Sequence, residues 1–304
     1  MRLSGVVVAT ITPMSRDGLA LAGEEVFAAY YRFLLSRGVH SVFVCGTTGE
    51  GPLLTTDERK RAAELTVKHI AKRIPVVVHV GAMPTTQAVE LAQHAAAIGA
   101  DAVAAVTPFF YPMDEEAMFQ FYRAVTSAIP GTPAYLYNIP AFSRNEIPPA
   151  LVGRLRRTCP NIVGIKHSDA NLIRMQEYRQ AGGKDFSLLS GSDAVAAAAL
   201  VLGADGCVSG NASAIPEASV ALYEAARRQD MAAVRREQEV LHDVRTLLGD
   251  GLSLASFKAA IEYRGIPVGG VRPPHRGLTT EESSHLERGL AALRQRGYLP
   301  HVTV

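Results

Sequence analysis

The chain has 304 residues, of which 48% are hydrophobic, and its 31 Lys and Arg residues nearly balance 29 Asp and Glu residues. This length suits one large α/β domain or two ordinary domains with a substantial core. A formal charge of +2 without a basic run argues against nucleic acid and membrane surfaces as partners. Three widely spaced cysteines argue against a disulfide framework or a structural zinc site.

The first residues, MRLSGVVVATITPMSRDG, contain only a short apolar run before a proline. This run is shorter than a signal peptide requires, and no later stretch is long enough to span a bilayer. We therefore expect a cytoplasmic protein.

Eight short apolar runs recur along the chain and are predicted to be β-strands. They are rich in Val and continuous rather than alternating, as expected for strands that are buried on both faces. They cover residues 5–10, 41–46, 75–81, 101–106, 133–138, 161–166, 186–191 and 205–210.

Longer stretches with helical spacing separate these runs. Residues 23–37 have apolar side chains on one helical face and are followed by Gly38, a common helix stop. Residues 55–72 open with Thr55 and Glu58 at the spacing of a capping box. Strand and helix patterns thus mostly alternate.

This alternation predicts a (β/α)8 TIM barrel, an α/β fold, over residues 1–215. The alternative is an open doubly wound sheet, which for a dinucleotide should show GxGxxG after the first strand; here that strand leads into ITPMSRDG. Residues 216–304 have helical patterns, interrupted by a Gly/Pro-rich loop at 265–277. They predict a C-terminal helical extension packed on the barrel.

The active site of such a barrel lies at the C-terminal ends of the strands, and Lys166 stands at the end of the sixth. It is one of only six lysines in the chain. Burial in an apolar mouth favours the neutral amine, which can attack a carbonyl carbon. The alternative is a structural lysine held in an ion pair.

The second strand ends in CGTTGEG, residues 45–51. Gly46 and Gly49 allow a tight turn whose backbone N–H groups lie beside the hydroxyls of Thr47 and Thr48. Such a turn can bind an anion, either a carboxylate or a phosphate. The alternative is an ordinary turn that leads into the next helix.

Tyr137 stands at the end of the fifth strand, where a phenol can relay protons beside an imine. The alternative is a core tyrosine with its hydroxyl at the rim. We interpret His79 as a hydrogen-bonded core residue, and His167 should point away from Lys166 because side chains alternate along a strand. Without HExxH or a close histidine–carboxylate cluster, no metal is expected.

At these residues the sequence resembles the dihydrodipicolinate synthase/N-acetylneuraminate lyase family of pyruvate-dependent class I aldolases. The resemblance implies a (β/α)8 barrel with a C-terminal helical part, no cofactor, and usually a homotetramer. It covers nearly the whole chain. The segments that carry it are GTTGEGPLLTTDER (46–59), AVTPFFYP (105–112), YNIPA (137–141), GIKHS (164–168), and GADG followed by SGN (203–211).

The resemblance also implies roles for particular residues. The Schiff-base lysine falls on Lys166, and the proton-relay tyrosine falls on Tyr137. The backbone near Val208 would lie beside the bound keto acid. The turn that binds the substrate carboxylate falls on Gly46, Thr47 and Thr48.

Two departures separate the chain from the synthase branch. Where the synthase has an arginine for a second carboxylate, this chain has Phe142, with Arg144 two residues further on. Where the synthase has a tyrosine that reaches across a subunit interface, the chain has Phe110, followed by Tyr111. Both segments look more like sialic-acid lyases and keto-deoxy sugar-acid aldolases.

Hydroxyl-binding positions of the lyase branch are partly retained. Asp193 matches an aspartate of the lyases, but the acidic residue that follows it there is Ala194 here. Ser168 falls where the lyases have a threonine. The expected contacts to a polyol substrate are therefore Ser168, Gly191, Asp193 and Ser209.

These comparisons predict cleavage or condensation of a 2-keto-3-deoxy sugar acid, or a similar 4-hydroxy-2-oxo acid, with pyruvate as one partner. The first alternative is 4-hydroxy-tetrahydrodipicolinate synthase, which joins pyruvate to aspartate semialdehyde. Others are dehydration or decarboxylation of a keto acid through the same imine, and a non-catalytic barrel that binds a keto acid. A metal-dependent aldolase would instead lose activity with chelators.

Overall fold

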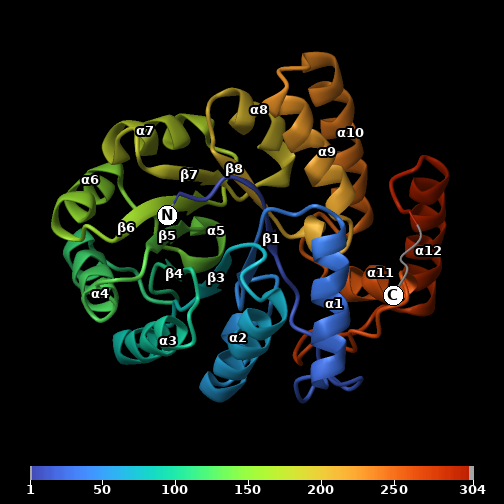
Figure 1. Ribbon diagram of the computed structural model, residues 1–304, viewed down its shortest axis with the longest axis horizontal. Coiled ribbons are helices and arrows are strands. Elements are labelled where there is room, and N and C mark those ends of the chain that lie inside the picture. Colours follow the sequence, from blue (N-terminus) through green and yellow to red (C-terminus); the bar gives the residue numbers. More distant parts are fainter. Residues whose placement is uncertain (1, 301–304) are drawn as a thin grey trace.

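The computed structural model describes residues 2–300, and within them eight parallel strands close into a barrel in sequence order. The predicted (β/α)8 barrel is confirmed, and the open sheet is excluded. Figure 1 shows the strands inside a surrounding layer of helices. The strands are β1 (Gly5–Ala9), β2 (Ser41–Val44), β3 (Val76–His79), β4 (Ala102–Val106), β5 (Ala134–Asn138), β6 (Ile162–His167), β7 (Ser187–Ser190) and β8 (Gly206–Ser209).

Side chains of alternate strand residues fill the barrel interior, and the others face the helices. At the N-terminal end, the Leu3 N–H donates to the Tyr135 hydroxyl at 2.8 Å, and the Ser187 hydroxyl donates to the Leu3 carbonyl at 2.8 Å. The N-terminal segment thus covers this end of the barrel. The buried apolar cluster inside the barrel includes Val7, Phe43, Val77, Ala104, Tyr137, Leu189 and Val208.

The helices form where the apolar periodicity predicted them. The stretch 23–37 contains α1, and the expected capping box is present, with Thr55 and Glu58 exchanging two hydrogen bonds at the start of α2. Within residues 2–300 the helices are α1 (Glu24–Ser36), α2 (Thr56–Ile70), α3 (Thr85–Ala97), α4 (Glu115–Ser127), α5 (Pro140–Ser143), α6 (Pro149–Thr158), α7 (Leu172–Gly182), α8 (Ala196–Val201), α9 (Pro216–Arg227), α10 (Met231–Leu247), α11 (Leu254–Tyr263) and α12 (Thr280–Gln295).

The C-terminal helices lie to one side of the barrel (Figure 1). Helix α9 contacts β1, β8 and α8, which is the position of the eighth barrel helix, and α10 packs along α9. Helix α11 contacts α12 and the short turn Asn211–Ser213 after β8. The division at residue 215 remains a prediction, and we propose that the barrel unit runs through α9. Met1 and residues 301–304, which the predicted domains include, lie outside the described residues.

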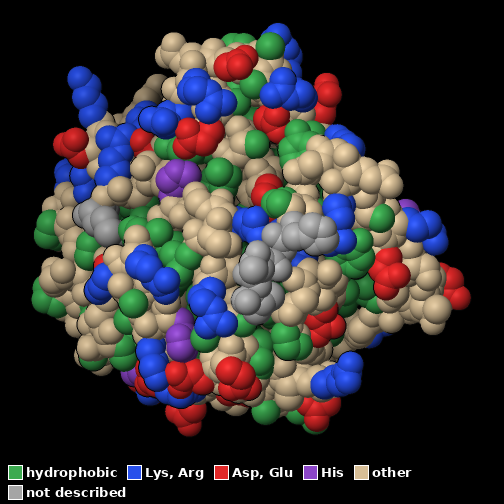
Figure 2. Space-filling view, turned by 45° about the vertical axis from the view of Figure 1, so that its right-hand side comes forward, with side chains coloured by type: hydrophobic (Ala, Val, Ile, Leu, Met, Phe, Trp, Pro, Cys, Tyr) green, Lys and Arg blue, Asp and Glu red, His purple; other side chains and the backbone are tan. Residues whose placement is uncertain are grey.

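Charged side chains of both signs are interspersed over the face of the molecule in Figure 2. This view shows no large area of a single charge sign. Among residues 2–300, no helix combines the length and apolar character that crossing a membrane requires.

Candidate active site

Lys166 and Tyr137 lie side by side at the C-terminal ends of β6 and β5. The two residues are Cα partners in the parallel ladder, so both side chains point into the barrel. The Lys166 Nζ lies 3.9 Å from the centre of the Tyr137 ring and 4.5 Å from the centre of the Phe43 ring. Lys166 is only 5% exposed. Its amine thus lies against two aromatic rings at the inner end of the barrel mouth.

The surroundings of Lys166 differ from those of a structural lysine. In the part of the chain that the structure describes, no carboxylate lies within ion-pair distance of its amine. Gly191, at the end of β7, leaves room for the side chain, because a Cβ there would lie 3.1 Å from Lys166 Cε and 2.0 Å from Ser168 Oγ. Gly191 therefore lies next to the amine-bearing side chain, as expected of a site residue.

The segment CGTTGEG forms a tight turn, but its left-handed residues are not the glycines, and Gly49 is instead needed because a Cβ there would lie 2.9 Å from the Thr10 carbonyl oxygen. Cys45 and Glu50 both have a left-handed backbone, with φ of 57° at each residue. The Glu50 N–H donates to the Thr47 carbonyl at 3.1 Å, and the Gly51 N–H donates to the Gly46 carbonyl at 3.0 Å. The turn thus lies directly above the end of β2 and is closed by its own backbone.

The predicted amine, phenol and turn come together. The hydroxyls of Tyr137 and Thr47 are 3.1 Å apart, which is hydrogen-bond distance. Val208, on β8, belongs to the same buried cluster as Tyr137. A Cβ on Gly210 would lie 3.0 Å from Thr48 Oγ1, so the second threonine of the turn faces the end of β8.

His79 is the hydrogen-bonded core residue that was expected, and it also supports Tyr137. Its Nδ1 donates to the Cys45 carbonyl at 3.1 Å, its Nε2 accepts from the Val106 N–H at 3.3 Å, and its ring meets the Tyr137 ring edge-on at 5.7 Å. Burial lowers the pKa of His79 well below its usual value, and the charges of Arg59 and Lys166 lower it further. His79 is therefore neutral.

Sequence reasoning missed Arg59, which reaches from α2 to the end of β3. Its guanidinium donates to the His79 carbonyl at 2.7 Å and to the Gly81 carbonyl at 3.1 Å. No sequence pattern predicts these two hydrogen bonds, because both acceptors are backbone carbonyls. His167 points away from the barrel interior as predicted: its ring meets the Tyr178 ring on α7 at 5.3 Å, and Nδ1 lies 3.1 Å from the Asn138 amide nitrogen.

A polar cluster lies at the ends of β7 and β8. Asp193 Oδ2 accepts from the Ser209 hydroxyl at 2.8 Å and from the Asn211 amide at 2.7 Å. Burial raises the pKa of Asp193, while these two hydrogen bonds oppose the shift. Asp193 Oδ1 and Ser168 Oγ are buried and have no hydrogen-bond partner among the described residues.

Three predicted substrate-binding residues have exposed side chains on the segments that follow β4 and β5, and their roles remain predictions. Phe110 and Tyr111, after β4, are 70% and 57% exposed, and Phe142, in α5 after β5, is 51% exposed. Arg144 is also exposed: its backbone N–H donates to the Pro140 carbonyl at 2.9 Å, but among the described residues its side chain makes no hydrogen bond or ion pair. The arginine that would replace the synthase side chain is therefore not held toward the barrel.

Asn145 joins the two loops that carry these aromatic residues, and sequence reasoning missed it. Its amide nitrogen donates to the Pro108 carbonyl at 2.7 Å and to the Tyr111 carbonyl at 2.8 Å. Its Oδ1 accepts from the Met113 N–H at 2.8 Å. The β5–α6 loop thereby holds the β4–α4 loop in place.

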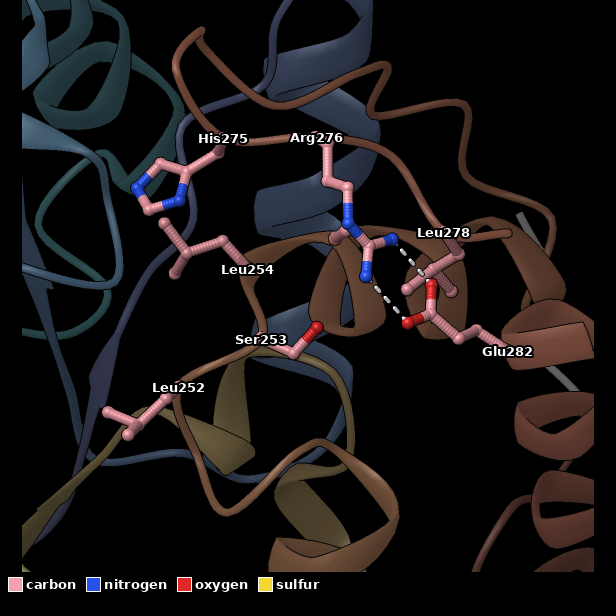
Figure 3. A pocket seen from close by; sticks show the side chains of 8 residues that line it. Leu252, Ser253, Leu254, His275, Arg276, Leu278 and Glu282 are labelled. Atoms are coloured by element: carbon pink, nitrogen blue, oxygen red, sulfur yellow. Dashed lines mark hydrogen bonds and ion pairs between the residues drawn. The ribbon is translucent and has the colours of Figure 1, made fainter.

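A separate cleft of about 170 Å³ lies in the C-terminal extension. In Figure 3, Arg276 and Glu282 form a paired, charge-neutral wall on one side of it, with Ser253 and Leu254 opposite. None of its lining residues belongs to a barrel strand or to the predicted site. In residues 2–300 no three His, Cys, Asp or Glu side chains are grouped so that they could hold a metal ion.

A barrel with an amine, a phenol and a hydroxyl-bearing turn at its C-terminal mouth is typical of enzymes that form an imine with a keto acid. Residues 2–293 match the family described as the dihydrodipicolinate synthetase family. The chain belongs to this family and is a pyruvate-dependent lyase of the class I aldolase type. The individual roles of the site residues remain predictions.

Relatives of the chain lie on different branches of this family. It is 37% identical over 291 residues to an uncharacterized DapA-like lyase of Halobacterium salinarum, covering 96% of this chain and 94% of that protein. Among solved structures, a sialic acid aldolase of Ruminococcus gnavus superposes with a TM-score of 0.93 at 26% identity, covering 98% and 100% of the two chains. YagE of E. coli K12, solved in complex with pyruvate, superposes with a TM-score of 0.89 at 28% identity, covering 97% and 99%.

Proposed function

We propose that this lyase cleaves or condenses a 2-keto-3-deoxy sugar acid, or a similar 4-hydroxy-2-oxo acid, with pyruvate as one partner. The observation that carries the proposal is the 3.1 Å contact between the hydroxyls of Tyr137 and Thr47, beside the amine of Lys166, which has no ion-pair partner within residues 2–300. This arrangement supplies a nucleophile, a proton relay and an anion-binding turn within one barrel mouth.

In the cleavage direction, the Lys166 amine adds to the ketone carbon, and loss of water leaves a protonated imine. Tyr137, which has become a phenolate by giving its proton to the departing water, takes the proton of the C4 hydroxyl as the C3–C4 bond breaks, and the electron pair moves to the imine nitrogen; the same proton can then return to C3. The aldehyde leaves and an enamine remains. Protonation at C3 and hydrolysis by water then release pyruvate and restore the amine. Thr47 and Thr48 hold the carboxylate throughout.

The polar cluster at β7 and β8 supports a hydroxylated substrate. Ser168 lies next to Gly191 and Lys166, and Asp193 and Ser209 are joined by a 2.8 Å hydrogen bond at the ends of β7 and β8, so hydroxyl and carboxylate groups are gathered where the chain of a polyol substrate would lie. The synthase product has a second carboxylate, and the exposed Arg144 is not held in the barrel mouth to bind it. The synthase reaction therefore remains the second candidate, and keto-acid dehydration or decarboxylation the third.

The experiment that tests the proposal is borohydride reduction in the presence of pyruvate, followed by peptide mass analysis. We expect a pyruvate-sized adduct on Lys166, its loss in Lys166→Met, and its retention in Lys60→Met, which removes a surface lysine that pairs with Glu90. A screen of aldehydes, with aspartate semialdehyde included, then separates the sugar-acid aldolase from the synthase. A folded wild-type protein that gives no adduct would contradict imine chemistry and favour a keto-acid-binding barrel.

We further propose that the enzyme is a homotetramer. The family resemblance supports this assembly, and the exposed Phe110 and Tyr111 offer apolar surface for a second copy. Light scattering on the purified chain tests it, and a monomer at micromolar concentration would contradict it.

A further inference from the structure

A buried ion pair joins the C-terminal extension to the turn of residues 45–51. Lys258, on α11, places its Nζ 2.6 Å from Glu50 Oε1, and each residue is only 2% exposed. The same amine donates to the Gly270 carbonyl at 2.5 Å, and Glu50 Oε2 accepts from the Arg272 N–H at 2.6 Å. Turn, helix and Gly/Pro-rich loop therefore meet at one buried point.

Glu50 is part of the turn that carries the two threonine hydroxyls. It has a left-handed backbone, and its N–H donates to the Thr47 carbonyl at 3.1 Å. The neighbouring Gly49 carbonyl accepts from the Thr12 hydroxyl at 2.7 Å. Because the turn is short and closed by these bonds, a displacement of Glu50 displaces Thr47 and Thr48 with it.

Helix α11 and the turn also approach the same residue, Gly210, at the end of β8. A Cβ on Gly210 would lie 3.0 Å from Thr48 Oγ1 and 3.7 Å from the ring of Phe257. Phe257 precedes Lys258 in the helix and is fully buried. Of two adjacent residues of α11, Lys258 therefore pairs with Glu50 of the turn, and Phe257 packs near Gly210, which Thr48 also faces.

We propose that Glu50 and Lys258 are positioning residues for substrate carboxylate binding, so that the C-terminal extension sets the affinity of the active site for its 2-oxo acid. The inference depends on the proposed function, in which Thr47 and Thr48 hold the carboxylate. Burying two charges costs a large desolvation free energy, and apolar replacement of such pairs is often neutral or stabilising. The pair supplies what an apolar contact lacks, namely a directional link between α11 and the turn.

The test measures borohydride trapping against pyruvate concentration for Lys258→Met, Glu50→Gln and the double variant. The pyruvate concentration that gives half-maximal trapping should rise about 10- to 100-fold, as expected for a carboxylate site that is displaced. The maximal trapping rate should stay within about threefold, because the Lys166 amine is untouched and saturating pyruvate restores occupancy. Lys258→Arg, which can still pair with Glu50, should recover part of the affinity.

Arg264→Met is the matched control. Arg264 follows α11 and is buried against Glu217 of α9, with Nη1 2.9 Å from Oε2, so this variant also breaks a buried ion pair of the extension. It should lower the thermal unfolding temperature without changing the pyruvate dependence.

Each outcome supports or overturns the inference. If Lys258→Met does not fold, the test relies on the double variant of Glu50→Gln and Lys258→Met. That variant leaves no unpaired charge buried between α11 and the turn. An unchanged pyruvate dependence in the double variant, or an equal change in Arg264→Met, overturns the positioning role. Absence of an adduct in the wild-type enzyme instead overturns the proposed function, so the two failures are distinguishable.

Discussion

The amine of Lys166 lies over the face of the Tyr137 ring, 3.9 Å from its centre, and the two residues are directly paired between β5 and β6. The Tyr137 hydroxyl lies at the edge of this contact, where it meets Thr47. The ring therefore packs against the amine while the hydroxyl is available for proton transfer, and the two roles can be separated by substitution.

Tyr137→Phe keeps the ring beneath Lys166 and removes the hydroxyl. We expect the pyruvate adduct to form still, while aldol cleavage slows by about 100-fold or more, as is usual for loss of a general acid–base group. Tyr135→Phe is the control, because its hydroxyl accepts from Leu3 at the opposite end of the same strand. Parallel loss of adduct and cleavage in Tyr137→Phe would contradict the separation.

Gly191→Ala should block the lysine side chain. The new methyl group would lie 2.0 Å from Ser168 Oγ and 3.1 Å from Lys166 Cε, so one of the two must move. We expect adduct formation to slow by about tenfold or more, because the amine is displaced from the ketone. Gly131→Ala, where nothing lies within 4 Å of the added methyl group, should behave like wild type. Normal trapping by Gly191→Ala would show that the site tolerates this crowding.

Phe110→Ala should change the choice of aldehyde more than it changes imine formation. Phe110 is 70% exposed on the loop after β4 and has a φ of 77°, a strained value for a residue other than glycine. Alanine removes the aromatic ring, while residue 110 must still adopt the same positive φ. The measurement compares borohydride trapping with kcat/KM for several aldehydes. Equal losses in both would refute the prediction.

Folding stability should decrease as the pH falls below about 6.5. Burial lowers the pKa of both His79 and His167 in the folded state, so between the folded and unfolded pKa values the unfolded chain binds more protons. Each histidine then weakens the fold by at most about 1.4 kcal/mol per pH unit. Denaturant unfolding at pH 7 and pH 5.5 measures the effect, and His79→Asn should reduce the slope. An identical slope in that variant would show that His79 does not contribute.

The barrel was predictable because short, Val-rich strands buried on both faces alternate with helices, and because the first strand is not followed by the GxGxxG of an open dinucleotide-binding sheet. Lys166 was predictable for a related reason, since a lysine at the end of such a strand is conspicuous. The position of Tyr137 beside it follows from strand order and register, because β5 and β6 are neighbours. These inferences use local pattern and barrel topology alone.

The supporting contacts were not predictable in the same way. Glu50 and Lys258 are far apart in the sequence, and the lysine sits in a helical segment like several others. Arg59 and Asn145 bind backbone carbonyls, which carry no sequence signature. The exposure of Phe110 and Phe142 depends on loop conformation, which apolar character alone does not predict.

The hydrogen bonds of Asn145 couple the two loops that carry the exposed aromatic residues, so the loops are expected to change together. A change in one loop alters the support of the other, whereas the residues proposed to form the imine and to bind the carboxylate lie on β5 and β6 and in the turn after β2 and are not involved. Redesign of substrate range by loop grafting should therefore transfer residues 107–113 and 139–147 together. A graft of either segment alone would break the hydrogen bonds between Asn145 and the carbonyls of the other loop. The same hydrogen bonds constrain which substitutions in these loops can accumulate during evolution.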